Sequence, residues 1–141
     1  MIPKRIIVDT GPLIAYVNKN DKYHNWSVSQ LATVTPPLMS CESVLSEACF
    51  LLRHFKNGSI NLLKMLGRQL ITLPFNLEEE IDAVGELVRK YQNIPMSLAD
   101  ACLVRMSEQI SGSVILTLDN DFKIYRKNKR NIVPTIMPDD L

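Results

Sequence analysis

The chain has 141 residues, of which 46% are hydrophobic and 22% charged, with a formal net charge of +1. This composition excludes an intrinsically disordered chain, and the near-neutral charge excludes attraction of the whole molecule to nucleic acid. No apolar run reaches the ~18 residues of a membrane span, and Asp9 interrupts the first apolar stretch. We therefore expect a cytoplasmic protein that forms one domain, residues 1–141.

The first predicted element is a short strand that is buried on both faces. Residues 6–8 are three consecutive β-branched residues, which are typical of a parallel sheet. Thr10 and Gly11 then turn the chain, and Pro12 suits the start of a helix. Asp9 thus lies at the carboxyl end of a strand, where open α/β sheets bind their ligands. The alternative interpretation is that Asp9 only caps the helix.

The rest of the chain alternates between short apolar strands and amphipathic helices. This alternation predicts an α/β fold on a parallel sheet with right-handed crossovers. The three cysteines, Cys41, Cys49 and Cys102, form no CxxC pair and are expected to be free thiols. Asp21 and Ser59 are expected to cap two of the helices. The pattern predicts helices at about 21–32, 42–55, 59–70, 77–91 and 97–110, a short helical piece at 122–127, and strands at 38–40, 71–73, 113–118 and 132–136.

Three further acids lie where a functional role competes with a structural one. Glu47 borders the apolar stripe of the helix predicted at 42–55, and Asp100 lies in the first turn of a later helix. Asp119 directly follows the strand predicted at 113–118. The structural alternatives are a solvated side chain at position 47, a capping box with an acid in the first helical turn at position 100, and an ordinary turn at position 119.

Two buried strands that each end in an aspartate suggest a common site. If the strands are neighbours, Asp9 and Asp119 converge at one edge of the sheet. Two carboxylates ~4 Å apart at an effective dielectric of ~20 repel by roughly 4 kcal/mol, so such a cluster takes up protons or holds a cation. Oxygen donors favour Mg²⁺ or Mn²⁺ over zinc, and these ions activate water against a phosphoryl group. The acids therefore indicate metal-dependent phosphodiester hydrolysis.

The acids lie in four sequence motifs. The motifs are VDTGPLIA at 8–15, SVLSEA at 43–48, SLADA at 97–101 and LTLDNDF at 116–122. They resemble those of the PIN domain, and most closely those of its VapC-like toxin branch. The resemblance extends over nearly the whole chain, in order. The family fold is a three-layer α/β/α sandwich around a parallel sheet, which agrees with the pattern of predicted elements.

The resemblance also implies a function and a set of site residues. Family members are ribonucleases, and the toxin branch cleaves RNA involved in translation. Such toxins are usually homodimers, and a cognate antitoxin covers their site. One departure is Gly11, where the family often has Ser; this change is expected to loosen the turn. By the family pattern, the acidic site for Mg²⁺ or Mn²⁺ consists of Asp9, Glu47, Asp100 and Asp119, with Asp121 as a fifth acid and with Thr10 and Thr117 as supporting hydroxyl groups.

A basic segment follows the last acids and is a candidate RNA contact. Phosphate binding by such residues releases counterions and weakens with salt. The alternative is a solvated face that balances the acids. Tyr125 within the segment offers an aromatic ring on which a base is expected to stack. The basic residues are Lys123, Arg126, Lys127, Lys129 and Arg130.

Two other functions compete with a metal-dependent ribonuclease that acts as the toxin of a type II toxin–antitoxin pair. The sequence Asp9-Thr10-Gly11 matches the catalytic signature of aspartic proteases, but those enzymes are β-rich, whereas this sequence predicts at least four helices. The second competitor is a catalytically inactive PIN-like module that binds RNA or protein. Retention of all four acids argues against this inactive module.

Overall fold

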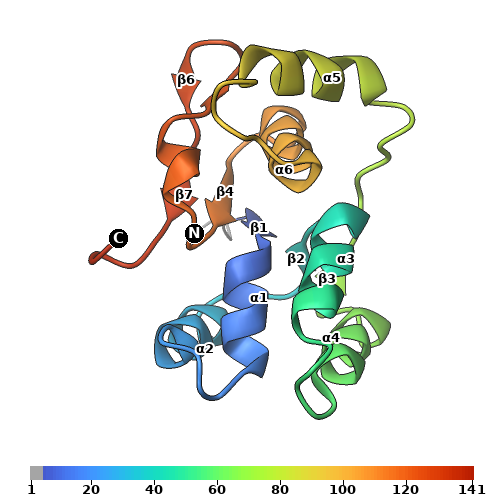
Figure 1. Cartoon of the computed structure of the whole chain (residues 1–141), viewed down its shortest axis with the longest axis vertical. Helices are drawn as coiled ribbons and strands as arrows, with labels where there is room; N and C mark the ends of the chain where they lie inside the picture. The colour runs from blue at the N-terminus through green and yellow to red at the C-terminus, as the bar shows by residue number, and fades with distance from the viewer. Residues whose placement is uncertain (1–4) are drawn as a thin grey trace.

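The fold is built on a five-stranded parallel sheet. The computed structural model describes residues 5–141. The strand order is β3-β2-β1-β4-β7, and every neighbouring pair is parallel (Figure 1). The strands are β1 (Arg5–Val8), β2 (Leu38–Met39), β3 (Ile71–Thr72), β4 (Ser113–Leu116) and β7 (Thr135–Ile136).

Helices cover both faces of this sheet. In Figure 1, α5 and α6 lie above the sheet, whereas α1 and α2 lie below it. Helix α3 packs against α1, α4 and α6. The predicted three-layer α/β/α sandwich around a parallel sheet is therefore confirmed. The helices are α1 (Thr10–Val17), α2 (His24–Ala32), α3 (Glu42–Leu51), α4 (Gly58–Gly67), α5 (Ile81–Lys90) and α6 (Leu98–Gln109).

The two central strands bring the first and last motifs of the chain together. Strand β1 pairs with β4 in a register that aligns Ile7 with Ile115 and Val8 with Leu116. All four of these side chains are 0% exposed, which explains why both strands are continuously apolar. The Asp9 N–H donates to the Leu116 carbonyl at 2.9 Å, so β1 and β4 end side by side.

Several predicted helix ends are wrong because local hydrogen bonds start or stop the helices elsewhere. The helix expected to run to residue 55 ends at Leu51, and the Arg53 side chain caps it by donating to the Phe50 carbonyl at 2.7 Å. The Asp21 carboxylate accepts from the Tyr23 N–H, which forms a turn before α2 and not its cap. Ser59 is not a cap either, because α4 begins one residue earlier, at Gly58.

The segment after β4 also differs from its prediction. Instead of a helix at 122–127, a short 3-10 helix η1 (Asn120–Lys123) is followed by β5 (Arg126–Lys127). Strand β5 pairs antiparallel with β6 (Asn131–Ile132), and two turn residues with positive φ, Asn128 and Lys129, connect them. The single strand expected at 132–136 is thus two strands, β6 and β7. Pro134 separates them, because it has no N–H for a strand ladder.

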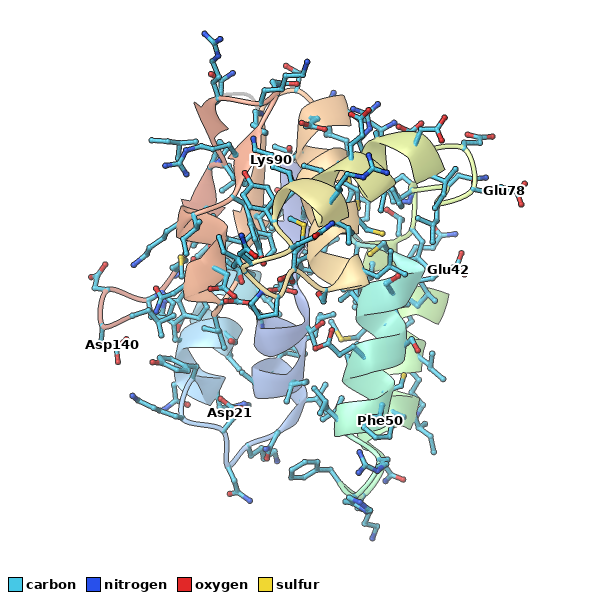
Figure 2. All side chains as sticks on the ribbon, turned by 45° about the horizontal axis from the view of Figure 1, so that its top comes forward. Asp21, Glu42, Phe50, Glu78, Lys90 and Asp140 are labelled. Carbon is cyan, nitrogen blue, oxygen red and sulfur yellow. The ribbon has the colours of Figure 1, made fainter. Side chains whose placement is uncertain are left out.

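Most charged side chains lie on the outside of the molecule. Glu42, Glu78 and Asp140 are exposed and extend away from the ribbon in Figure 2. No helix within residues 5–141 is long and apolar enough to cross a membrane. Cys41 and Cys102 are buried and Cys49 is partly buried, and all three thiols are free, as predicted.

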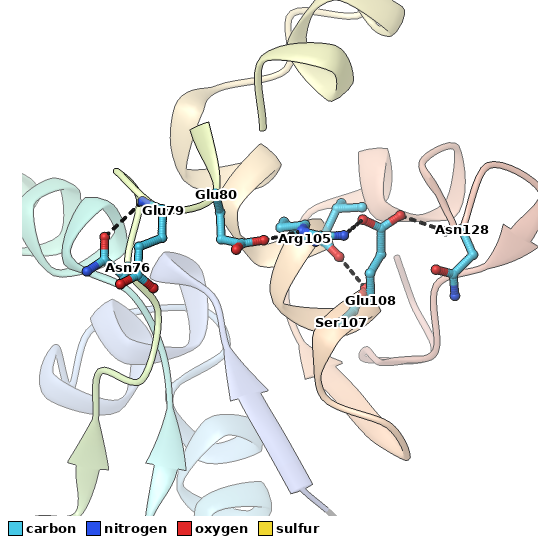
Figure 3. Close-up of polar contacts among 8 residues, drawn as sticks. Asn76, Glu79, Glu80, Arg105, Ser107, Glu108 and Asn128 are labelled. Atoms are coloured by element: carbon cyan, nitrogen blue, oxygen red, sulfur yellow. Dashed lines mark hydrogen bonds and ion pairs between the residues drawn. The ribbon is translucent and has the colours of Figure 1, made fainter. Parts of the chain in front are cut away.

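An ion-pair network joins α5, α6 and the β5–β6 hairpin (Figure 3). Arg105 of α6 donates to Glu80 at 2.7 Å and to Glu108 at 3.2 Å. The second oxygen of Glu108 accepts from the Asn128 N–H in the hairpin turn at 2.6 Å. The side chains of Arg105, Glu80 and Glu108 are only partly exposed, so solvent weakens their bonds little. This network therefore holds the hairpin against the C-terminal half of α6.

We expect Ile115→Ala to destabilise the protein by about 2–5 kcal/mol, because it leaves a cavity in the centre of the sheet. The matched control is Ile132→Ala, since this side chain is 70% exposed. The control should change the unfolding free energy by no more than about 0.5 kcal/mol. Urea unfolding followed by circular dichroism measures both values. Equal effects would contradict the assignment of Ile115 to the core.

Candidate active site

Asp9 is held at the junction of β1 and α1 by two hydrogen bonds. Its Oδ1 accepts from the Thr10 N–H at 2.7 Å, so Asp9 does cap α1, which was the structural alternative. Its Oδ2 accepts from the Thr117 hydroxyl at 2.7 Å. A cap requires only the first of these bonds. The second bond joins the ends of the two central strands and fixes the orientation of a carboxylate that is 6% exposed.

Asp119 is connected to Asp9 through the same threonine. The Asp119 N–H donates to the Thr117 hydroxyl oxygen at 2.9 Å, while the Thr117 O–H donates to Asp9. The Asp119 carboxylate in turn accepts from the Asp121 N–H at 2.9 Å. Thr117 is fully buried, and its hydroxyl group thus contacts both aspartates.

Asp100 comes from the first turn of α6. Its N–H donates to the Ser97 hydroxyl oxygen at 3.0 Å, which is the predicted helix cap. The carboxylate itself does not take part in that cap. Its Oδ2 accepts from the Tyr125 hydroxyl at 2.9 Å, and the residue is only 8% exposed.

The four predicted acids line one pocket at the carboxyl edge of the sheet. Its volume is about 220 Å³. Each acid comes from a different segment: the end of β1, helix α3, helix α6 and the loop after β4. Among these acids, only Glu47 is exposed to solvent. The residues that line the pocket are Asp9, Thr10, Gly11, Ile14, Glu47, Leu51, Asp100, Leu118 and Asp119.

Burial and mutual repulsion make the two most enclosed acids hard to ionise. Burial raises the pKa of Asp9 to about 7; the charges of Asp100 and Asp119 add to this rise, and the hydrogen bonds from Thr117 and Thr10 oppose it. Burial likewise raises the pKa of Asp100 to about 6, with contributions from the charges of Asp119 and Glu47. A cation in the pocket would reverse both effects, because it stabilises the ionised carboxylates.

The donor set of the pocket fits a hard divalent cation. It offers carboxylate and hydroxyl oxygens only, which Mg²⁺ and Mn²⁺ prefer. In residues 5–141, however, no three acid, histidine or cysteine side chains stand close enough to share one ion. Binding would therefore draw side chains inward. Glu47 is the side chain most able to move, since it is exposed and no hydrogen bond holds it among the described residues.

Two further predicted site residues have different surroundings. Asp121 is half-buried and does not line the pocket, but its backbone N–H holds the Asp119 carboxylate. The Thr10 hydroxyl is buried and makes no hydrogen bond within the described part of the chain. An oxygen donor without a partner, at the pocket wall, suits a bound water or ion.

The basic segment directly follows the last acids in the sequence, but its turn lies at a distance from them in space. Its turn is attached to Glu108, eight residues along α6 from Asp100, which corresponds to about 12 Å along the helix axis. The Lys127 ammonium donates to the Ser107 carbonyl, and the Lys123 ammonium donates to the Leu141 carbonyl. Arg126 caps three backbone carbonyls. Lys129 and Arg130 remain exposed at the turn.

One expectation about an individual residue is wrong. Tyr125 cannot stack on a base, because it is 0% exposed; its hydroxyl contacts Asp100 instead. Local sequence holds no signal for that contact, because the two residues are 25 positions apart.

Gly11 lies in the first turn of α1 and packs closely against Leu118. An added Cβ would lie 3.1 Å from the Leu118 Cβ. Glycine therefore allows Leu118 to pack directly on this turn beside the pocket.

We expect Asp9→Asn to stabilise the metal-free protein, and more so as the pH rises. Because the pKa of Asp9 is raised from 3.8 to about 7 on folding, only the unfolded chain loses this proton between those values. The unfolding free energy of the parent protein therefore falls as the pH rises from 3.8 to about 7. The total fall is up to about 4 kcal/mol and is complete above pH 7. Asparagine does not titrate. Urea unfolding in EDTA at pH 4.5, 6 and 8 measures the difference.

The matched control is Asp139→Asn, which removes an exposed carboxylate outside the pocket. It should change the unfolding free energy by no more than about 0.5 kcal/mol at each pH. A difference between parent and Asp9→Asn that stays constant from pH 4.5 to 8 would contradict the raised pKa.

Comparisons with known proteins agree with this architecture. No curated protein sequence matches the chain significantly. Among solved structures, the chain is similar to the crystal structure of VapC20 from Mycobacterium tuberculosis, described as a sarcin–ricin loop cleaving toxin. The TM-score is 0.76 at 20% identity, over 84% of this chain and 93% of that one. This likeness concerns the fold. The sequence model of the PIN domain matches residues 6–128, and the chain therefore belongs to the PIN domain family.

Proposed function

We propose that the chain is an endoribonuclease that uses Mg²⁺ or Mn²⁺ and acts as the toxin of a type II toxin–antitoxin pair. The observation that carries the proposal is the convergence of four acids, from four separate segments, on one pocket. Membership of the PIN domain family and the fold shared with the VapC20 toxin support it.

In this proposal the acids Asp9, Asp100, Asp119 and Glu47 hold the cation, and Asp121 supports Asp119 or binds directly. The ion, when bound, activates water and neutralises charge that develops on the scissile phosphoryl group. Asp9 is oriented in advance by Thr117 and the Thr10 N–H, so little side-chain entropy is lost when it binds. Glu47 completes the set from the exposed side of the pocket.

The hairpin turn at Lys129 and Arg130 supplies the RNA contact outside the pocket. Both side chains are exposed, whereas Lys123, Arg126 and Lys127 already donate to backbone carbonyls. Ammonium and guanidinium groups retain further donors, so these three residues can still contact phosphate. A strand of RNA whose phosphate lies in the pocket would reach the turn a few nucleotides away.

The proposed partners are RNA, a cognate antitoxin and a second copy of the chain, in the cytoplasm. Large apolar side chains on the outside of α3 and α4 support a protein interface: Phe50 is 61% exposed, Ile60 55% and Leu63 51%. Such exposed apolar side chains, where they are contiguous, often mark interaction surfaces. VapC20 itself is described as a toxin.

The aspartic protease alternative is wrong. Asp9 follows a parallel strand, and Thr10 and Gly11 begin helix α1, in an α/β sandwich and not in a β-rich fold. The inactive PIN-like binding module remains as the competitor. It predicts RNA or protein binding without metal-dependent cleavage.

We expect the purified protein to cleave RNA with Mg²⁺ or Mn²⁺ and to stop cleaving in EDTA. Asp9→Asn should lower the cleavage rate by at least about 100-fold, because even outer-shell partners of metal ligands contribute 10–100-fold. Asp139→Asn, the same substitution outside the pocket, should retain the parent rate. Cleavage of a labelled RNA, followed on denaturing gels, measures these rates. Cleavage that survives both EDTA and Asp9→Asn would refute the metal centre, and RNA binding without any cleavage would favour the inactive module.

We also expect Lys129→Gln with Arg130→Gln to weaken RNA binding. Loss of two phosphate contacts should reduce the slope of log K against log salt by about 1.4 for single-stranded RNA. The control pair, Lys19→Gln with Lys56→Gln, removes the same charge from exposed loops at the opposite end of the molecule from the hairpin (Figure 1). Fluorescence anisotropy with Asp9→Asn as the background avoids cleavage. Equal slopes of log K against log salt for the two double variants would show that the hairpin does not contact RNA.

A further inference from the structure

Tyr125 is a fully buried side chain whose polar atom contacts the candidate site. It lies between η1 and β5, outside all four sequence motifs, and is 0% exposed. Its hydroxyl donates to Asp100 Oδ2 at 2.9 Å. Burial raises the pKa of Asp100, and the Tyr125 hydroxyl opposes this rise more than the Ser97 hydroxyl does.

Aromatic packing fixes the direction of the Tyr125 hydroxyl. The ring meets Tyr91 edge-on, with centroids 5.1 Å apart, and meets Phe122 edge-on at 5.2 Å. The Tyr125 N–H donates to the Asp121 carbonyl at 3.1 Å. Close packing on two sides leaves the ring one rotamer, so the hydroxyl remains directed at Asp100.

Asp100 needs such a restraint more than Asp9 does. Asp9 is held through both oxygens, by Thr10 and Thr117. Asp100 accepts from Tyr125 through Oδ2, while Asp119 and Glu47 repel its charge. Without the hydroxyl, repulsion would favour rotamers that turn the Asp100 carboxylate away from the other acids. With it, the carboxylate is held through Oδ2, and its remaining lone pairs stay available to a cation.

We propose that Tyr125 is a positioning residue, which orients the Asp100 carboxylate to bind the divalent cation. The inference rests on the proposed metal centre. Tyr125 acts through Asp100 and touches neither cation nor RNA. Its contribution is therefore to cation affinity: once the cation is bound, the cleavage step requires nothing further from this hydroxyl.

The test compares two Tyr→Phe substitutions in the same aromatic cluster. Tyr125→Phe keeps the ring and removes the hydroxyl that holds Asp100. Tyr91→Phe is the matched control, because the Tyr91 hydroxyl accepts from the Arg126 N–H at 2.8 Å and contacts no acid. Mn²⁺ affinity is measured without RNA, by electron paramagnetic resonance of free Mn²⁺ and by calorimetry. Thermal unfolding is measured on the same samples.

We expect Tyr125→Phe to weaken Mn²⁺ binding by 10–100-fold, as for other partners of metal ligands. The Mn²⁺ concentration for half-maximal RNA cleavage should rise by the same factor, with a rate at saturating Mn²⁺ near that of the parent. Tyr91→Phe should lower the melting temperature and leave Mn²⁺ affinity unchanged. A double-mutant cycle completes the test: in the Asp100→Asn background, Tyr125→Phe should have little further effect on Mn²⁺ affinity.

The outcomes separate the positioning role from the metal centre itself. Equal Mn²⁺ affinity of Tyr125→Phe and parent overturns the positioning role alone. Equal losses of affinity in Tyr125→Phe and Tyr91→Phe overturn it too, because the effect is then general loosening of the cluster. A further loss in the Asp100→Asn background, equal to that in the parent, shows that Tyr125 does not act through Asp100. A parent protein that binds no Mn²⁺ refutes the proposed metal centre, and the positioning role with it.

Discussion

The hydrogen bond between Thr117 and Asp9 organises the candidate site, because it joins residues 108 positions apart at the ends of the two central strands. The register of β1 with β4 makes this bond possible. The same hydroxyl accepts from the Asp119 N–H, so one buried oxygen determines where two of the acids stand. The remaining acids arrive from α3 and α6, which pack against each other beside this junction. A shift of one residue in this register would turn Thr117 to the other face of the sheet and break its bond to Asp9.

Much of this arrangement follows from local sequence. Continuous apolar runs at positions 6–8 and 114–116 predict strands buried on both faces, and their ends place Asp9 and Asp119 at one edge of the sheet. Ser97 predicts the start of α6 and hence the position of Asp100 in its first turn. Glu47 is different: its helix is evident, but that it faces the pocket depends on how α3 packs. In each of the predictable cases, the structure that the local sequence favours is also the one that the tertiary fold requires.

The segment after Asp119 could not be predicted, because its structure is set by distant residues. Tyr125 and its neighbours have helical spacing, yet Asp100 and Tyr91 draw the ring inward and the chain leaves the helix. The hairpin turn is fixed by Glu108, which belongs to a helix that precedes it by 20 residues. The five basic residues therefore form one run in sequence, but three of them donate to backbone carbonyls, whereas Lys129 and Arg130 lie at the exposed turn. The spacing of the charges in the sequence does not predict these different surroundings of the basic residues.

Burial of the acids lowers the stability of the metal-free protein, because it raises the pKa values of Asp9 and Asp100. The same raised pKa values determine how the site responds to a cation. With its pKa near 7, Asp9 is about half protonated at neutral pH, whereas Asp100, near 6, is mostly ionised. A divalent cation requires both carboxylates in ionised form, so binding it expels a proton from Asp9. Affinity must then rise with pH up to about 7 and level off above it, because no proton remains to be displaced. Residues that orient carboxylates without adding charge, such as Thr117 and Tyr125, ease this exchange: they stabilise the ionised form in the geometry that the cation requires.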